Sequence, residues 1–456
     1  MEIVLLGTGA ADGWPNAFCT CASCQAARAA GTLRSPTAAL VDGTLLLDCG
    51  PEAARGAERA GRSLADVRHV LVTHEHPDHC DPAALLWRRW AGRPEPLEVL
   101  GPPAVVAACE PWIGPEDPVR LRALSAGHSV PLGAHHVRAL AGAHEVSVLL
   151  WDVTGPSGGR LLYATDTGPL PAETLDALAG RAYDVVLLEL TFGTRTDHGT
   201  GHLDMETFPR ELARLRTVGA VTDDTDVVAV HLGHHNPPEP ELSRLLAAWG
   251  ARAVPDGAVL AVGSSPPVRE PVPSRTLVLG GARSGKSAEA ERLLGAEPTV
   301  DYVATGGERP EDPEWVERVA SHRGRRPTDW RTLECADLVG VLGSPGPPVL
   351  VDCLTLWLAG VLDRRRVWEG GALLPVREEV AGLVEAVRRT PRRVVLVSNE
   401  VGSGVVPATA SGRVFRDELG RLNAEVAAAC EEVRLVVAGV PVVVKGGPGR
   451  GPDGAS

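Results

Sequence analysis

A short run of metal-binding residue types, Thr73-His74-Glu75-His76-Pro77-Asp78-His79, follows the apolar segment 69–72 and precedes a helical pattern. The spacing H-x-H-x-D-H brings three imidazoles and a carboxylate onto one strand-to-helix loop, where two metal ions can bind a few ångströms apart. Four metal-binding side chains in one loop are better explained by a bound cation than by the alternative that the loop is merely a polar turn. The sequence therefore predicts a dinuclear metal site.

A second run has the spacing of a phosphate-binding P-loop. It follows the strand-like segment 276–279 and opens a helical run at 288–294. The run comprises Gly280, Gly281, Ala282, Arg283, Ser284, Gly285, Lys286 and Ser287. Backbone N–H groups cradle phosphate oxygens in such a loop, Lys286 neutralises them and Ser287 can hold magnesium. Asp352 ends another buried strand and supplies a second magnesium-directing carboxylate or, in the plainer interpretation, a turn residue.

Basic charge in this chain is carried almost wholly by arginine, and lysine occurs only at Lys286 and Lys445. A lysine at the P-loop position is therefore informative. A third cluster, Cys19, Cys21 and Cys24, offers three thiolates in one loop, but tetrahedral zinc needs a fourth ligand. Three reduced, unpaired thiols are the alternative.

Two sets of elements must position these residues. Before residue 263, β-rich runs near 3–6, 38–48, 70–73, 97–100, 147–153, 160–165, 185–190 and 227–231 alternate with helical patterns at 83–90 and 205–216, which predicts sheets covered by helices. After residue 274, strand-like runs at 276–279, 302–304, 349–352, 394–398 and 435–438 alternate with longer helical segments. That alternation predicts a parallel α/β sheet.

The 456 residues favour two domains. Four prolines among small and polar residues mark 263–274 as a linker, and the Gly-rich run 446–456 is predicted to be a disordered tail. We therefore expect a metallohydrolase domain at 1–262 and a P-loop domain at 275–445.

Composition excludes several classes of protein. A formal net charge of −13 disfavours a nucleic-acid partner. The nine cysteines are mostly scattered, unlike those of a disulfide-rich secreted domain, and no apolar stretch is long enough for a membrane span. The chain starts without a signal-peptide pattern, so we expect a soluble, cytoplasmic protein. The oligomeric state is left open, and a homo-oligomer is one of the options.

Five segments from the second half occur in order: the P-loop, Tyr302-Val-Ala-Thr305, Val351 to Leu358, Ser398 to Pro407, and Gly412 to Asn423. Together they resemble the bifunctional adenosylcobinamide kinase/adenosylcobinamide-phosphate guanylyltransferase family of cobalamin nucleotide-loop assembly. The resemblance implies Mg²⁺ with ATP or GTP, the substrates adenosylcobinamide and adenosylcobinamide phosphate, and transfer of GMP through a guanylylated histidine that matches His322. A neutral imidazole can attack the α-phosphorus and pass GMP onward.

The first half resembles the metallo-β-lactamase superfamily, with its αββα sandwich of two mixed sheets between helices. That resemblance implies His74, His76 and His144 on one metal, Asp78, His79 and His231 on the other, and Asp166 as the bridge, with Zn²⁺ or Mn²⁺ as the ions. The phosphoribosyl cyclic phosphodiesterase branch has a similar cysteine cluster, which implies one structural Zn²⁺ on Cys19, Cys21, Cys24 and His234. The branch also implies a general acid matching His202, with His198 as a nearby competitor.

The complete interpretation is a kinase and nucleotidyltransferase fused to a dinuclear hydrolase that acts on a phosphoester. A thioesterase, an RNA-processing nuclease and a non-catalytic corrinoid-docking module are the alternatives for the first domain. The acidic composition disfavours the nuclease.

Overall fold

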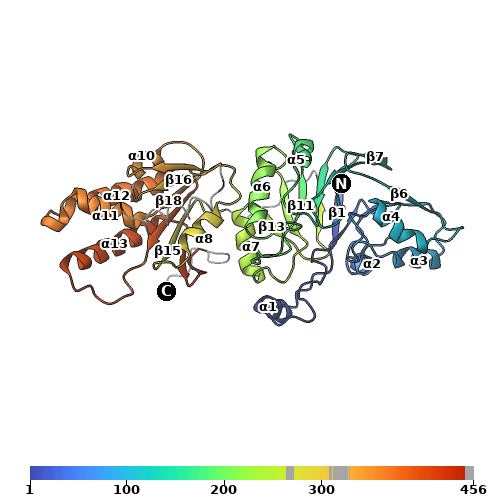
Figure 1. Ribbon diagram of the computed structural model, residues 1–456, viewed down its shortest axis with the longest axis horizontal. Coiled ribbons are helices and arrows are strands. Elements are labelled where there is room, and N and C mark those ends of the chain that lie inside the picture. Colours follow the sequence, from blue (N-terminus) through green and yellow to red (C-terminus); the bar gives the residue numbers. More distant parts are fainter. Residues whose placement is uncertain (263–271, 308–310, 312–326, 328, 447–456) are drawn as a thin grey trace. The chain divides into compact units, whose positions relative to one another are not determined.

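The computed structural model describes residues 1–262, 272–307, 311, 327 and 329–446. The chain divides into two compact units, Met1–Glu270 and Pro271–Ser456, each with its own sheets and helices (Figure 1). Most of the predicted linker and of the predicted tail lies outside the described residues.

The first unit contains two seven-stranded sheets. The first sheet has the order β14 (Val259–Ala261), β1 (Glu2–Gly7), β2 (Ala38–Val41), β3 (Leu45–Leu47), β4 (His69–Leu71), β5 (Leu97–Gly101) and β6 (Val119–Ala123). The second has the order β13 (Ala251–Ala253), β12 (Asp226–Val230), β11 (Val185–Glu189), β10 (Arg160–Ala164), β9 (Leu149–Thr154), β8 (His135–Ala141) and β7 (Ser129–Leu132). Each sheet is antiparallel in one half and parallel in the other.

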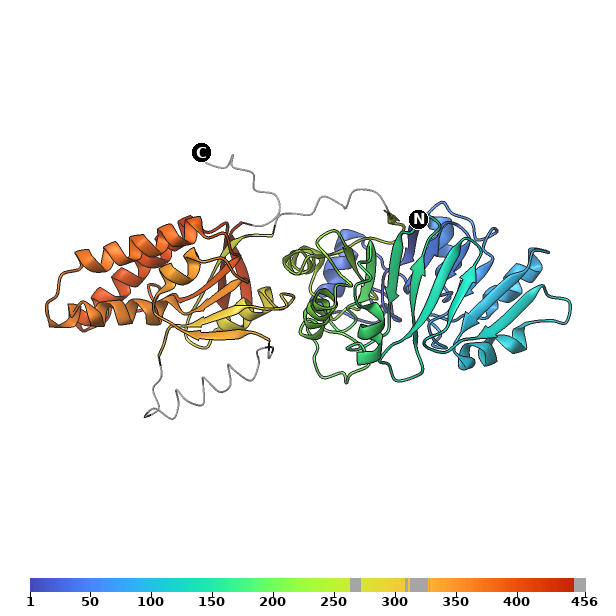
Figure 2. The ribbon, with the colours of Figure 1, turned by 90° about the horizontal axis from the view of Figure 1, so that it is seen from above.

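Side chains of β1 show how the layers form. Ile3 and Leu5 point into a core shared with Val137, Trp151 and other residues of the opposite sheet, whereas Val4 and Leu6 pack on the helix side. This is the alternation expected of a strand buried on both faces. The helices α2 (Ala53–Arg59), α3 (Ala83–Trp90) and α4 (Pro103–Cys109) cover the first sheet, and α5 (Ala172–Leu178), α6 (Thr207–Thr217) and α7 (Glu239–Ala248) cover the second (Figures 1 and 2). The predicted αββα sandwich is therefore confirmed.

The predicted strand at 38–48 is in fact a hairpin. β2 and β3 pair antiparallel, and the chain reverses between them at Asp42 and Gly43, whose φ angles are 46° and 68°. Asp-Gly is a preferred pair for a tight turn with left-handed backbone, and this explains why a continuous apolar pattern is broken here.

The second unit contains one seven-stranded sheet. Its order is β17 (Arg331–Glu334), β16 (Asp301–Ala304), β18 (Val349–Asp352), β19 (Val394–Asn399), β15 (Arg275–Gly280), β20 (Glu432–Val437) and β21 (Val440–Lys445). The remaining described helices are α1 (Ala22–Ala30) in the first unit and α8 (Lys286–Leu293), α10 (Leu338–Gly343), α11 (Leu354–Arg364), α12 (Leu374–Arg389) and α13 (Ala410–Ala429) in the second, with single 3-10 turns at Glu110–Trp112 and Val367–Glu369.

This sheet is parallel, as predicted, except at one edge. β21 pairs antiparallel with β20 after a turn at Ala438 and Gly439. The edge strand positions Lys445, whose Nζ donates to the carbonyl oxygens of Ala427 at 2.8 Å and of Cys430 at 2.6 Å. One of the two lysines therefore stabilises the C-terminal end of α13, where the helix dipole favours a cation.

Candidate active site and metal centre

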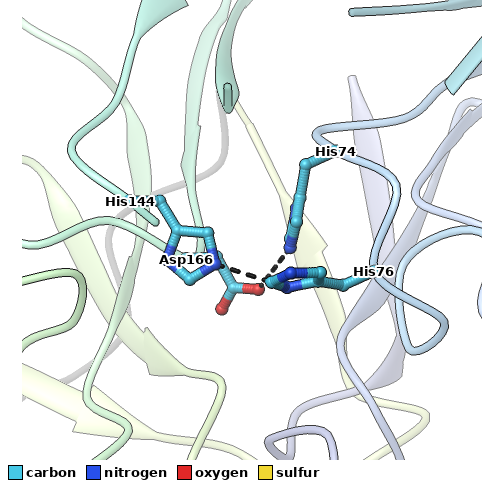
Figure 3. A group of neighbouring side chains, drawn as sticks. All are labelled: His74, His76, His144 and Asp166. Atoms are coloured by element: carbon cyan, nitrogen blue, oxygen red, sulfur yellow. Dashed lines mark hydrogen bonds and ion pairs between the residues drawn. The ribbon is translucent and has the colours of Figure 1, made fainter. Parts of the chain in front are cut away.

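The predicted metal ligands of the first unit meet at the ends of its strands. The loop after β4 carries His74, His76, Asp78 and His79, and the loops after β8, β10 and β12 carry His144, Asp166 and His231. Figure 3 shows His74, His76, His144 and Asp166 directed toward one another. Asp166 and His231 have φ angles of 50° and 54°, a left-handed conformation that is costly for residues other than glycine and that is often found at functional sites.

The seven side chains form two groups. In one, single ligand atoms of His74, His76, His144 and Asp166 lie within 4.8 Å of one another, and in the other the same holds for Asp78, His79, Asp166 and His231. Asp166 belongs to both, since its Oδ2 lies 2.7 Å from Nε2 of His79 and 3.2 Å from Nε2 of His74. The superfamily resemblance implies such a position between the groups for a bridging carboxylate.

The donor set fits divalent cations. Nε2 of His74 faces Oδ2 of Asp166, and Oδ1 of Asp166 faces Nε2 of His231 at 3.1 Å, yet among the described residues neither His74 Nε2 nor Asp166 Oδ1 makes a hydrogen bond of suitable geometry. Buried polar atoms are nearly always satisfied, and a metal ion would satisfy both. Imidazole nitrogen and carboxylate oxygen are ligands for Zn²⁺, and carboxylates also suit Mn²⁺.

Hydrogen bonds from outside each group orient the imidazoles. Nδ1 of His79 lies 2.7 Å from Oδ2 of Asp48, and Nδ1 of His144 lies 3.0 Å from the Gly201 carbonyl oxygen. Both partners can only accept, so each Nδ1 carries a proton, and Nε2 is the nitrogen that can bind a metal once it has released any proton of its own.

Two threonines act in the same way. The hydroxyl of Thr191 donates to Glu189 and therefore accepts from Nδ1 of His231 at 2.9 Å. The hydroxyl of Thr73 donates to Asp48 and accepts from Nδ1 of His74 at 3.0 Å. In four of the five imidazoles, Nε2 is thus the nitrogen that faces the centre of the group and can bind a metal.

Electrostatics keep the carboxylates ionised. Burial opposes the charge on Asp78, but hydrogen bonds from His231 and His79 hold the pKa of its carboxyl below the ordinary value. Burial likewise opposes the charge on Asp166, and the charges of His231 and His79 lower its pKa. Burial disfavours the charge on His79, yet the carboxylates of Asp166 and Asp48 raise the pKa of its imidazole. The groups therefore supply anionic oxygens to a cation.

The structure separates His202 from its competitor His198. His202 lines the pocket over the metal groups, and its Nδ1 lies 3.0 Å from Oε1 of Glu189. Burial disfavours its charge, but Glu189 raises the pKa of His202 to about 9. His198 instead pairs with Asp204 at 3.0 Å and does not line that pocket.

The cysteine cluster is only partly assembled. Sγ of Cys19 and Cys24 and a ring nitrogen of His234 lie within 4.8 Å of one another. Cys24 is 0% exposed, and burial raises the pKa of its thiol to about 12, so its ionisation would need a cation. Cys21 is the exception: its Sγ accepts from the backbone N–H of Cys24 at 3.4 Å and lies 3.9 Å from the His234 carbonyl oxygen.

The P-loop of the second unit connects β15 to α8. The helix begins at Lys286, two residues earlier than predicted, after Gly285 with a φ of 95°. Nζ of Lys286 donates to the Gly281 carbonyl oxygen at 3.1 Å, so the lysine lies back over the loop that runs from Gly280 through Ser284 to Ser287. Asp352 ends β18, two strands from β15, and accepts from the Tyr302 hydroxyl at 2.7 Å. His322 lies outside the described residues.

Sequence reasoning missed two residues of this site, Asp48 and Glu189. Both are 0% exposed and follow or end apolar strands, β3 and β11. A buried acid at a strand end was a usable signal, since it needs several donors to be stable there. Nothing in the local sequence indicated which donors these would be.

The first unit, two facing mixed sheets with His/Asp groups at their strand ends, has the metallo-β-lactamase fold, and the second is a P-loop α/β unit. A family model described as "Beta-lactamase superfamily domain" matches residues 44–231. A second model, "Cobinamide kinase / cobinamide phosphate guanyltransferase", matches residues 276–444. Through this second unit the chain belongs to the cobinamide kinase/cobinamide phosphate guanyltransferase family, and both resemblances inferred from the sequence are confirmed.

Two individual relatives agree with the family assignment of the second unit. The chain is 40% identical over 180 residues to the bifunctional adenosylcobalamin biosynthesis protein CobU of Salmonella typhimurium, covering 37% of this chain and 98% of that protein. It is 43% identical over 182 residues to CobP of Pseudomonas aeruginosa, covering 38% and 99%. A ribonuclease of Thermus thermophilus is 33% identical over 172 residues, covering 33% of this chain and 39% of that protein.

Solved structures similar to the chain include Zn²⁺-bound PqqB from Methylobacterium extorquens, with 20% identity, 57% and 100% coverage and a TM-score of 0.47. A diphosphatase from the PhnP family has 19% identity, 57% and 97% coverage and a TM-score of 0.46. Within the described residues, no helix is long and apolar enough to cross a membrane.

Proposed function

We propose that the second unit phosphorylates adenosylcobinamide and then transfers GMP from GTP to the product, with Mg²⁺ and ATP or GTP bound at the P-loop. Family membership carries this proposal, and the P-loop geometry supports it. Lys286 and the N–H groups at the start of α8 would hold phosphate oxygens. Asp352 would direct the magnesium ion, and His322 would carry the GMP.

For the first unit we propose a dinuclear metal-dependent phosphoesterase. The observation that carries the proposal is the pair of His/Asp groups sharing Asp166, next to a histidine that is paired with a carboxylate. When bound, two divalent cations supply a hydroxide at neutral pH and neutralise charge on the phosphoryl oxygens.

The protein's own residues would bind the cations and donate the proton to the leaving group. Asp78, His79 and His231 would hold one cation, His74, His76 and His144 the other, and Asp166 would lie between them. His202 keeps its Nδ1 on Glu189, and a pKa of about 9 leaves the ring protonated at neutral pH. Its Nε2 can then donate a proton to the leaving alkoxide. A thioester releases a stable thiolate and needs no such acid, which favours the phosphoester.

A structural Zn²⁺ on Cys19, Cys24 and His234 is also proposed, with Cys21 as the fourth ligand. The Cys21 thiol is already directed at the His234 carbonyl group, so a rotation of the Cys21 side chain would complete a tetrahedral site. Such an ion would tie the loop before α1 to the loop that follows His231.

Similarity to a ribonuclease favours RNA as a second candidate substrate. The charge of the chain speaks against it, as do the acidic side chains Asp12 and Glu145 in the pocket lining. A corrinoid-docking module without turnover would use the fold but would have no need of His202 beside the metal ligands.

The test uses the full chain loaded with Zn²⁺ or Mn²⁺. Release of phosphate from α-ribazole phosphate or a cobamide phosphate is compared with turnover of a cyclic ribose phosphate, a thioester and RNA, for the native protein and for Asp78→Ala and His202→Ala. We expect phosphoester cleavage that both substitutions reduce. Cleavage of the thioester or RNA alone would overturn the proposal, and inactivity on every substrate with tight corrinoid binding would favour docking.

A further inference from the structure

The pocket above the metal groups has an unusual charge distribution for a site that is to bind phosphates. Its volume is about 280 Å³, and besides the metal ligands it is lined by Ala10, Ala11, Asp12, Glu145, Thr191, Phe192, His202, Gly233, His234 and His235. Among the described residues that line it there is no arginine or lysine. Phosphate groups that are bound away from a metal are normally held by such side chains or by helix N-termini.

Apart from His202, which is paired with Glu189, the charged side chains that line this rim are acids. Glu145 directly follows His144 and is exposed, and a methyl group placed on Gly201 would lie 3.5 Å from its Cγ. Its side chain therefore stands against the loop that carries His202, and its charge contributes to the raised pKa of that histidine. Asp12 is 40% exposed, and its Oδ2 lies 3.1 Å from Nδ1 of His234. Both carboxylates border the space that a substrate would occupy outside the metal groups.

An aromatic wall accompanies the acids. The ring of Phe192 lines the pocket and stacks on His198, with centroids 4.2 Å apart and planes at 4°. His235 lies on the same wall, with its centroid 5.8 Å from that of Phe192. The face of the Phe192 ring, next to carboxylates, attracts organic cations and tolerates flat neutral groups. The guanidinium of Arg195 lies 5.9 Å from the centroid of this ring but is paired with Asp197.

We propose that the substrate of this pocket carries one phosphate, the one that is cleaved, and that the rest of the molecule is neutral or positively charged near the metal groups. The metal centre and the protonated His202, which act on the same phosphate, can neutralise one phosphate here, whereas a second phosphate would face Glu145 and Asp12. Charges inside a pocket of this size lie within a Debye length, about 8 Å at physiological ionic strength, so salt does not remove the repulsion. Polynucleotides and nucleoside polyphosphates are therefore poor substrates.

This inference rests on the proposed phosphoesterase function and is tested with chromogenic substrates in matched pairs. One pair is thymidine 5′-(p-nitrophenyl phosphate) with and without a 3′-phosphate, which differ only in distal charge. The other is p-nitrophenyl phosphorylcholine and ethyl p-nitrophenyl phosphate, which differ in a quaternary ammonium group. The full chain is assayed with Mn²⁺ as the native protein, as Glu145→Gln, and as Glu173→Gln, a matched control on an exposed acid of α5 outside the pocket.

We expect kcat/KM to favour the nucleotide without the 3′-phosphate and the choline ester over the ethyl ester. Glu145→Gln should reduce the ratio of kcat/KM values within each pair by roughly three- to tenfold, the range for one surface charge acting across a few ångströms of water. Glu173→Gln should leave both ratios unchanged. Equal turnover within each pair, or ratios that Glu145→Gln does not alter, would overturn the inference. If no substrate is cleaved by the native protein, the proposed phosphoesterase function fails instead.

Discussion

Asp48 offers a sharp test of the proposed metal centre because it contacts the ligand His79 without lying among the ligands. Its carboxylate accepts from the Thr73 backbone N–H at 2.7 Å through Oδ1, and from Nδ1 of His79 at 2.7 Å and the Tyr163 hydroxyl at 2.9 Å through Oδ2. Replacing Asp48 by asparagine keeps the shape and can keep the bonds at Oδ1. The amide nitrogen then takes the place of Oδ2 and directs its protons at His79.

That change reverses the role of the imidazole. Nδ1 of His79 would have to accept from the new amide, so the ring proton would move to Nε2, the atom that faces Asp166 and Asp78 at 2.7 and 2.9 Å. A protonated Nε2 cannot bind a metal. If the ring keeps its present tautomer, it loses a hydrogen bond to a charged group, worth about 1.5–3 kcal/mol. Because about 1.4 kcal/mol corresponds to tenfold in affinity, Asp48→Asn should weaken one metal site by roughly 10- to 100-fold.

The assay is metal content by mass spectrometry together with a chelator competition titration of the full chain. Asp42→Asn is the matched control, since Asp42 also accepts from a histidine, His135, at 2.8 Å, but away from the metal groups. We expect the control to bind both cations like the native protein and Asp48→Asn to lose one of them at low free metal. Unchanged affinity and stoichiometry in a folded Asp48→Asn protein would refute the tautomer argument.

Three further predictions concern the other sites. Lys286→Ala should abolish phosphorylation of adenosylcobinamide, because no nearby residue replaces its ammonium group at the phosphates. Lys445→Ala, which changes the only other lysine, should retain this activity. Equal activity of the two variants would contradict the P-loop assignment. Incubation with α-labelled GTP should leave an acid-labile label on the native protein and none on His322→Ala. The variant should still phosphorylate adenosylcobinamide. A label that survives the substitution would exclude this histidine as the carrier of GMP. Purified protein should lose one tightly held zinc in Cys24→Ser but not in Cys335→Ser, and an unchanged zinc content would remove the structural site.

The sequence predicted the two folds and the metal-binding residue types because those signals are local. The spacing from His74 to His79 is compressed into one loop, and the P-loop is a single strand, turn and helix. Ligands from other strands, His144, Asp166 and His231, could be named only through the family resemblance, because their approach depends on how two sheets face each other.

Most of the strands that were missed lack a strong pattern, although the largely buried β8 was missed as well. β21 is an edge strand whose valines alternate with little burial, and β7 and β14 are short and partly exposed. Their pairing is decided by neighbouring strands rather than by their own residues, so the periodicity of a short segment does not reveal it. The hairpin of β2 and β3 was predicted as one continuous strand for the opposite reason, because the strands on both sides of its turn are fully apolar.

Glu189 shows why a functional residue can be invisible in a sequence and still control several others. Its buried carboxylate accepts from the backbone N–H of Thr167 at 2.7 Å and of Leu203 at 3.1 Å, the residues that directly follow Asp166 and His202. It also orients His202 directly and His231 through the Thr191 hydroxyl. One anion at the end of β11 therefore positions the candidate bridging carboxylate, the candidate acid and a candidate metal ligand together. The distances among those three groups depend on the strand end more than on the loops that carry them, which explains how three separate loops can hold the geometry of the proposed two-metal site.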